Sequence, residues 1–183
     1  NETFFGLVCG WESAAAVLCG APCDGTDSVR PGPRFARRAK RSESFGMESY
    51  SPYQDKDLFD CAILDSGDLE LPFGSPEKAL ELIRQRTETI LAADKLPVMI
   101  GGEHLVTLGA VRAAAAKYPD LHILHFDAHT DLRQDYLGET LSHATVIRRC
   151  WDSLGDGKIH QFGIRSGEGD EFRWAKDHTT LCK

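Results

Sequence analysis

The stretch "LPVMIGGEHLVTLGAVRAAAAKYPDLHILHFDAHTD", residues 96–131, decides the fold. Its first apolar run ends in a glycine pair, and the alanine-rich run that follows stops at Pro119. A second apolar run then ends in Asp-Ala-His-Thr-Asp. Short apolar runs closed by turn residues are typical of buried strands, whereas the longer run is typical of a helix. The stretch therefore predicts a strand, a helix and a second strand, which together form the βαβ unit of a parallel sheet.

The same alternation continues on both sides of this stretch. We expect further strands within residues 15–22, 61–72 and 158–166, and helices within residues 34–45, 75–91, 142–154 and 169–178. The helix after Ser75 has the clearest start, because serine is a good N-cap and Pro76 suits the first helical position. Its apolar stripe contains Ala79, Leu80, Ile83, Thr87, Ile90 and Leu91. Strand–helix alternation with short connections predicts an α/β fold: one three-layer αβα domain over residues 1–183, with a mostly parallel sheet.

Composition limits the function classes. The chain has 183 residues, of which 42% are hydrophobic and 27% charged, as in globular proteins with a real core. Its net charge of −7 argues against a nucleic-acid partner, because phosphate binding needs a basic face. We find neither a signal peptide nor an apolar run near the roughly 20 residues that span a bilayer, so we expect no membrane association and a cytoplasmic location. The six cysteines form no Cys-x-x-Cys pair, which favours reduced thiols over a redox or metal role.

Polar residues that are costly to bury follow two predicted strands, where α/β sheets bind their ligands. Asp127, His129 and Asp131 occupy alternate positions, so in an extended chain they would project to one side. His104 follows the glycine pair, which permits a sharp turn and close backbone approach, and would point to the same place. A divalent cation would remove the repulsion and desolvation of such a cluster. Carboxylate and imidazole donors without thiolate indicate Mn²⁺, with Zn²⁺ or Fe²⁺ as alternatives.

Other interpretations of these residues stay open. A polar hydrogen-bonded network at the strand ends, without metal, is the structural alternative. His122 and His125 lie inside the predicted strand and are interpreted as packed core histidines, although His125 has the same parity as Asp127. His143 opens a predicted helix and could carry a proton at the site, or could cap the helix or face solvent.

Several segments together resemble the ureohydrolase family of arginases and agmatinases, and the bacterial agmatinases most of all. They are "GAPCDGTDSVRPGPRFARRA", "MIGGEHLVTLGAVRA", "HFDAHTDLR" and "SHATVIRR", and the resemblance spans essentially the whole chain. It implies an arginase-like αβα fold that is incomplete at its C-terminal end, because the family's second acidic motif, Asp-x-Asp then x-x-Asp-Pro, has no counterpart after Asp131. We therefore expect the N-terminal portion of a longer protein, with four of the six ligands, weak metal binding and no activity on its own.

The resemblance also implies roles for individual residues. The intact protein would hold two Mn²⁺ per active site: His104 and Asp131 would bind one, His129 would bind the other, and Asp127 would bridge both. A metal-bridging hydroxide would attack the carbon of a small guanidino substrate, and His143 would relay a proton to the leaving amine. For agmatine, the products would be urea and the polyamine putrescine. Family members assemble as trimers or hexamers, so a homo-oligomer is implied.

Two departures from the family pattern leave other functions within the family open as alternatives. Glu103 stands where the family usually has Asp, at a position that is not a direct ligand. Arg133 lies where arginases carry an Asn that reads the amino-acid end, which disfavours arginine, and it would also repel the distal amine of agmatine unless it points away. The alternatives are a guanidinobutyrase, a formimidoylglutamase, an arginase, or an inactive truncated paralogue that acts as an oligomer partner.

Overall fold

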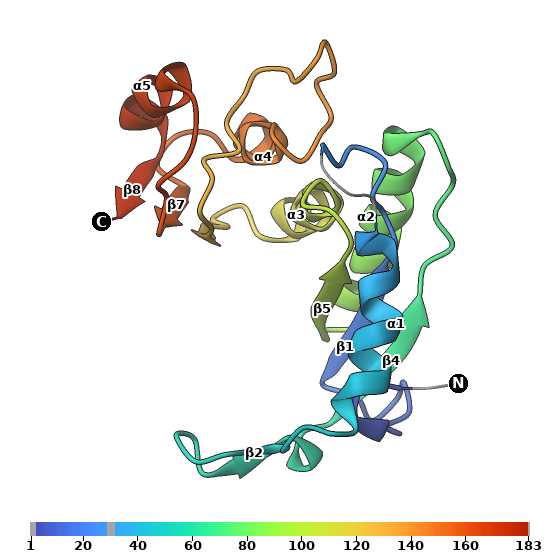
Figure 1. Ribbon diagram of the computed structural model, residues 1–183. Coiled ribbons are helices and arrows are strands. Elements are labelled where there is room, and N and C mark those ends of the chain that lie inside the picture. The colour runs from blue at the N-terminus through green and yellow to red at the C-terminus, as the bar shows by residue number, and fades with distance from the viewer. Residues whose placement is uncertain (1–2, 29–31, 183) are drawn as a thin grey trace.

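The computed structural model describes residues 3–28 and 32–182, which form an α/β structure with parallel sheets (Figure 1). The first sheet contains, in spatial order, β4 (Ile63–Asp68), β1 (Ala16–Ala21) and β5 (Leu96–Gly101). The second contains β6 (Ile123–Phe126), β7 (Ile159–Phe162) and β8 (Thr180–Cys182). All strands in both sheets run parallel, which confirms the predicted fold class. The strands divide into two sheets because, among the described residues, β5 pairs with β1 alone and β6 pairs with β7 alone.

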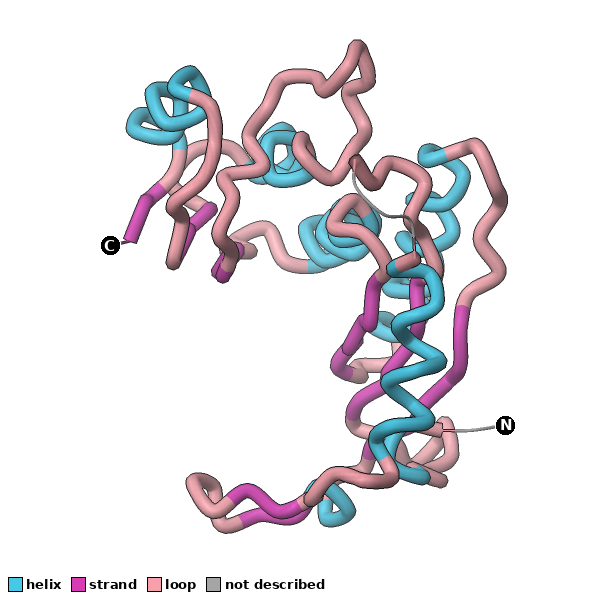
Figure 2. The backbone as a smooth tube through the Cα atoms, in the orientation of Figure 1, coloured by secondary structure: helices cyan, strands magenta, loops and turns pink. Residues whose placement is uncertain are grey.

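Five α-helices lie among the described residues: α1 (Pro33–Ser44), α2 (Pro76–Ala92), α3 (Val106–Lys117), α4 (Val146–Leu154) and α5 (Gly169–His178). The short elements are the 3₁₀ turns η1 (Phe4–Gly6) and η2 (Leu58–Asp60) and the hairpin of β2 (Tyr50–Ser51) and β3 (Lys56–Asp57). The hairpin projects away from the layered body (Figure 2). Neither the hairpin nor β8 was predicted, because two- and three-residue strands carry too little periodicity to detect.

The two faces of the first sheet are covered by different helices. Val17 and Cys19 of β1 pack against Ile90 of α2, whereas a Cβ at Gly20, on the opposite face, would meet the Arg37 side chain of α1. Successive strand residues point to opposite faces, so α1 and α2 lie on opposite sides of the sheet, as Figure 1 shows. This arrangement is the expected helix–sheet–helix layering.

Helix α2 forms as the sequence predicts. The Ser75 hydroxyl accepts a hydrogen bond from the Lys78 amide at 3.4 Å, and Pro76 occupies the first turn. Its buried residues are the predicted stripe of Ala79, Leu80, Ile83, Thr87, Ile90 and Leu91. Burial of a large aliphatic side chain such as Ile83 or Ile90 contributes roughly 1.5–3 kcal/mol, so this stripe fixes the helix against the sheet.

One buried cluster lies between the helices of the two halves. Its members come from α2, α3, α4, α5, β7, the residue before α3 and the loop between β6 and α4, and are Leu80, Leu105, Leu108, Leu132, Val146, Ile147, Cys150, Ile159 and Ala175. Helix α3 contacts both α2 and α4, so it is the element through which the two halves pack. Helix α4 begins at Val146, four residues after the predicted start at position 142.

Two further observations concern the cysteines and the lengths of the helices. All six cysteines are free; Cys19 and Cys150 are buried, whereas Cys61 is exposed. Among residues 3–28 and 32–182, no helix is long and apolar enough to cross a membrane.

Buried ion pairs attach α1 to β4. Arg41 donates to both oxygens of Asp65, from Nε at 2.7 Å and from Nη2 at 2.9 Å, and to Asp68 from Nη1 at 2.6 Å. Burial tends to raise the pKa of Asp65, but the hydrogen bonds from Arg41 and from backbone amides outweigh it, so the pKa lies below its usual value. Both side chains are shielded from water. Removal of either one would leave a buried charge without its partner, which lowers the free energy of unfolding.

Replacement of Arg41 should therefore destabilise the fold in a pH-dependent way. Because the pKa of Asp65 is lowered on folding, its contribution to stability is present above about pH 4 and is lost as the pH falls through the folded-state pKa. We expect Arg41→Met to lower the free energy of unfolding by about 3–5 kcal/mol at pH 7, with a smaller difference in acid. Urea unfolding at several pH values measures this. Arg38→Met, on the exposed face of α1, is the matched control, and equal losses from both variants would contradict the prediction.

Candidate metal centre

The loops that follow the carboxyl ends of β1, β5, β6 and β7 meet in one cavity of about 440 Å³. Its lining residues are Asp27, Ser28, His104, Asp127, His129, Thr130, Asp131, Arg133, Tyr136, His143, Ala144, Ser166, Gly167 and Glu171. All five residues that the sequence marks as metal-binding or catalytic are among them. The strand ends therefore form a site at the edge where parallel sheets bind ligands.

The glycine pair after β5 lets two strand-end loops touch. A Cβ on Gly102 would lie only 1.8 Å from the Cys23 carbonyl oxygen, so no other residue fits without a shift of backbone. Here the Gly102 amide donates to the Ala21 carbonyl at 2.9 Å, and the Glu103 amide donates to the Cys23 carbonyl at 2.7 Å. The buried Glu103 carboxylate accepts hydrogen bonds from the amide and hydroxyl of Thr26. Glu103 thus ties the two loops together and leaves His104 to face the cavity.

Four side chains crowd together at the floor of the cavity. The ligand atoms of His104, His125, Asp127 and Asp131 all lie within 4.8 Å of one another. Nδ1 of His104 lies 2.6 Å from Oδ2 of Asp131 and 3.8 Å from Oδ2 of Asp127. Three of the four predicted ligands therefore converge.

The fourth predicted ligand, His129, lies on the other side of Asp127. Its Nδ1 is 3.2 Å from Oδ1 of Asp127, and its side chain is 64% exposed. Strand β6 ends at Phe126, and Asp131 has a φ of 51°, so the extended conformation needed to align Asp127, His129 and Asp131 does not persist. A left-handed turn, which aspartate tolerates better than most residues, carries Asp131 back to His104. The predicted residues come together because the chain turns at Asp131, and not because alternate residues of an extended strand face the same side.

His125 joins the cluster although the sequence analysis set it aside as a core residue. It is buried, with Nδ1 3.0 Å from the Gln161 amide nitrogen, so it is packed as predicted. Its Nε2, however, lies 3.5 Å from Oδ2 of Asp127 and makes no hydrogen bond among the described residues. The shared parity of His125 and Asp127 was the signal that could have identified it. His122 stays outside the cavity, beside His160.

His143 faces the cavity from the loop before α4. Its ring packs edge-on against Tyr136, and its Nδ1 is buried without a hydrogen-bond partner among the described residues. The N-cap position of α4 is Thr145, so His143 lies outside the cap position. Across the cavity, burial and the charges of Glu103 and Asp24 raise the pKa of the Asp27 carboxyl. The charge of His143 has the opposite effect on this pKa but does not cancel the rise.

Arg133 lines the cavity, but its charge is already balanced. Its guanidinium pairs with Glu168 at 2.8 Å and with Glu171 at 3.8 Å, and it lies over the Tyr136 ring at 5.2 Å. Glu171 also accepts hydrogen bonds from the Thr130 hydroxyl at 2.5 Å and the Leu132 amide at 2.9 Å. Helix α5 thus holds the residues on both sides of Asp131.

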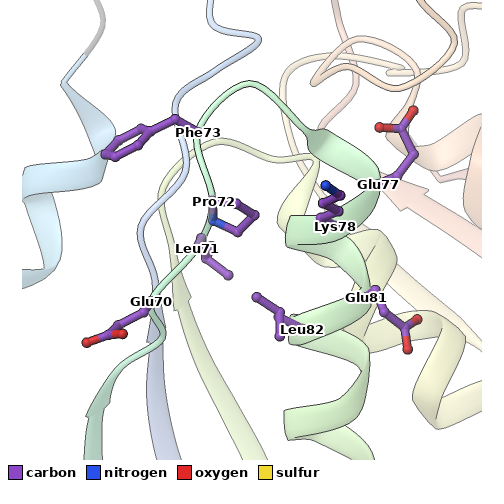
Figure 3. Close-up of a pocket in the computed structure, with 8 residues that line it drawn as sticks. All are labelled: Glu70, Leu71, Pro72, Phe73, Glu77, Lys78, Glu81 and Leu82. Atoms are coloured by element: carbon purple, nitrogen blue, oxygen red, sulfur yellow. The ribbon is translucent and has the colours of Figure 1, made fainter.

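A larger apolar hollow of about 700 Å³ lies elsewhere, between residues 70–73 and the first turns of α2 (Figure 3). Leu71, Pro72 and Leu82 face it, while Glu70, Glu77 and Glu81 point their carboxylates in different directions. These charged groups do not converge, so the hollow offers no comparable chemistry.

Comparison with known proteins places the chain in a family. Residues 14–182 match the model of the arginase family. The chain belongs to the arginase family. It is 51% identical to the agmatinase of Bacillus subtilis, over 92% of this chain and 58% of that protein. It is 38% identical to the N(1)-aminopropylagmatine ureohydrolase of Thermococcus kodakarensis, over 91% of this chain and 56% of that protein.

Solved structures agree with this assignment. A crystal structure of a putative agmatinase from Clostridium difficile superposes with a TM-score of 0.90 at 51% identity, over 93% of this chain and 63% of that one. The arginase-family chain therefore spans about three-fifths of the length of the relatives that it matches.

The residues present in this arginase-family chain suit a divalent metal. Burial tends to raise the pKa of Asp127, but the His129 amide and the charges of His125 and His104 outweigh it, so the pKa is lowered. Burial, followed by the charge of His104, lowers the pKa of His125. At neutral pH the Asp127 carboxylate is therefore ionised, as a metal ligand must be, and the buried His125 imidazole beside it is neutral and adds no positive charge against a cation. Oxygen and imidazole donors without thiolate suit manganese, zinc or iron.

The close contact between Gly102 and the Cys23 carbonyl can be tested by adding a methyl group at position 102. Gly102→Ala would force the loop of Cys23 away from β5, so we expect the free energy of unfolding to fall by about 1–3 kcal/mol. Chemical denaturation measures the loss. Gly25→Ala is the control, because a Cβ at Gly25 meets no atom within 4 Å. An unchanged stability for Gly102→Ala would show that this contact does not constrain the fold.

Proposed function

We propose that the whole protein is a manganese-dependent hydrolase that releases urea from a guanidino compound, with agmatine as the favoured substrate. One observation carries the proposal: the two oxygens of Asp127 face different imidazoles. Oδ2 lies 3.8 Å from His104, and Oδ1 lies 3.2 Å from His129. A carboxylate placed in this way can serve two cations at once. The similarity to agmatinases at about half of all positions supports the same function.

Each side chain of the centre has a proposed role in metal binding or proton transfer. His104 and Asp131 would hold one manganese, His129 the second, and Asp127 both. Two bound manganese ions would supply Lewis acidity, which lowers the pKa of water towards neutrality and stabilises developing negative charge. His143, with its unpartnered Nδ1 at the cavity wall, would carry the proton that the departing amine needs.

The charges around the cavity favour a cationic substrate. Asp27, Asp127, Asp131 and Glu171 line it, and Arg133, which is the only lysine or arginine of its lining among the described residues, is paired with Glu168 and Glu171. Agmatine carries a guanidinium and a second amine, so it gains from this surplus of carboxylates. Guanidinobutyrate, formiminoglutamate and arginine carry a carboxylate, for which the described wall offers no free cation.

The substrate proposal is tested by urea or ammonia release from a panel of substrates. The whole protein, loaded with Mn²⁺, should hydrolyse agmatine with a kcat/KM at least 100-fold above that for arginine, guanidinobutyrate or formiminoglutamate, which corresponds to about 3 kcal/mol of charge discrimination. Removal of metal with a chelator should abolish the reaction, and added Mn²⁺ should restore it. A preference for guanidinobutyrate or another acid would overturn the choice of agmatine.

The same assay tests the assigned centre. Asp127→Asn keeps the shape of the side chain but removes its charge, and we expect kcat to fall by about 10³-fold or more, with weaker Mn²⁺ binding. Asp135→Asn, at an exposed position of the same loop, is the matched control. If the two variants had equal activity, Asp127 would not be part of the centre.

Three sequence-based expectations stay predictions. The 183 residues alone should bind Mn²⁺ weakly and lack activity, the whole protein should form a homotrimer or hexamer, and it should be cytoplasmic. Urea release by this chain and by the whole protein, with light scattering for the oligomeric state, measures the first two.

A further inference from the structure

The floor of the metal site contains a buried histidine that the proposed mechanism does not use. We propose that His125 is a positioning residue: it aims the Asp127 carboxylate by donating from Nε2, and it does not bind the metal itself. The proposal rests on the proposed function, since it takes Asp127 to be a metal ligand. It depends on which ring nitrogen of His125 carries the proton, and Gln161 of the neighbouring strand β7 determines this.

Gln161 is the residue beside His125 in the register of β6 and β7, and its side chain is fully buried. Its amide nitrogen lies 2.9 Å from the Thr130 carbonyl oxygen and 3.0 Å from Nδ1 of His125. Its amide oxygen accepts from the Thr179 hydroxyl at 3.2 Å. A backbone carbonyl can only accept, so the end of Gln161 that faces Thr130 must be the NH₂ group. Thr130 therefore fixes the orientation of this amide.

The fixed amide selects the tautomer of His125. The NH₂ group of Gln161 can only donate, so Nδ1 of His125 must present its lone pair. A neutral imidazole has one proton, which is then on Nε2. An Nε2 that carries a proton has no lone pair for a metal, so His125 cannot act as a ligand while Gln161 holds it in this state. Of the four residues whose potential ligand atoms lie close together, His125 is therefore not a ligand.

The Nε2 proton has one clear use. Nε2 lies 3.5 Å from Oδ2 of Asp127, about 0.6 Å beyond a normal N–H···O contact, and makes no hydrogen bond among the described residues. Hydrogen bonds at catalytic sites are often long in empty sites and shorten in the complex. Oδ1 of Asp127 already accepts from the His129 amide at 2.8 Å. Donation to Oδ2 would therefore fix the second oxygen and orient the carboxylate towards His104 and Asp131.

The tautomer can be measured directly in the metal-free chain. In a ¹⁵N-histidine sample, long-range ¹H–¹⁵N correlation spectra distinguish a protonated ring nitrogen from one with a lone pair. We expect His125 to show its proton on Nε2, and Gln161→Leu to remove that preference. A proton on Nδ1 in the unmodified chain would overturn the proposal. This measurement needs neither metal nor activity.

Two amide variants of His125 test the donor itself. The glutamine amide can reach the position of Nε2, whereas the shorter asparagine amide reaches only that of Nδ1. We expect His125→Asn to weaken Mn²⁺ binding by roughly 10–100-fold, as removal of such supporting groups commonly does, and His125→Gln to bind nearly as the unmodified chain does. Binding is followed by the electron paramagnetic resonance signal of free Mn²⁺, with thermal unfolding of each variant recorded to confirm that it is folded.

The outcomes separate the roles of His125. Equal losses in both variants would identify a ligand, and unchanged binding in both would identify packing alone; either result overturns the proposal. If the unmodified chain and the whole protein bound no Mn²⁺, the proposed function would fail, while the tautomer measurement would still decide whether Gln161 sets the proton of His125.

Discussion

The site depends on the contact between Gly102 and the Cys23 carbonyl, where no side chain can be accommodated. Strands β1 and β5 run side by side, and their pairing continues past their ends through the amides of Gly102 and Glu103. This continuation brings the Glu103 carboxylate to Thr26, and Thr26 in turn accepts from the His143 amide at 3.1 Å. A single close approach of backbone thus connects the loop after β1, the proposed ligand His104 and the proposed proton carrier.

Local features of the sequence were sufficient for most of the fold. Helix α2, with its serine cap and apolar stripe, and the strands β1, β5 and β6 were predicted because periodicity and caps act within a few residues. The division into two sheets could not be predicted, because strand pairing depends on residues far apart in the chain. For the same reason the basic face of α1 gave no sign that Arg37 and Arg41 are buried against carboxylates of β4.

The sequence identified residues that line one cavity, but it did not predict how they are arranged there. The acidic and histidine positions follow from the strand ends, whereas the left-handed turn at Asp131 is decided by tertiary contacts. The Asp131 carbonyl accepts from the amides of Ile147 and Arg148 at the start of α4, which holds that turn in place. His125 was missed because strand residues usually serve the core, and its buried polar partner, Gln161, lies 36 residues further along the chain. The pairing of Arg133 with Glu168 likewise spans 35 residues.

Glu171 connects the second sheet to the proposed metal centre. It is buried on α5, yet its carboxylate holds Thr130 and Leu132, the neighbours of Asp131. Helix α5 lies between β7 and β8 along the chain, so the conformation of Asp131, a proposed metal ligand, depends on the docking of a whole β–α–β segment. By thermodynamic linkage, a cation that selects the ordered Asp131 turn also stabilises this docked segment, and fraying of α5 weakens the affinity for the cation to the same degree. The proposed metal centre and the C-terminal part of this chain would therefore form one cooperative unit.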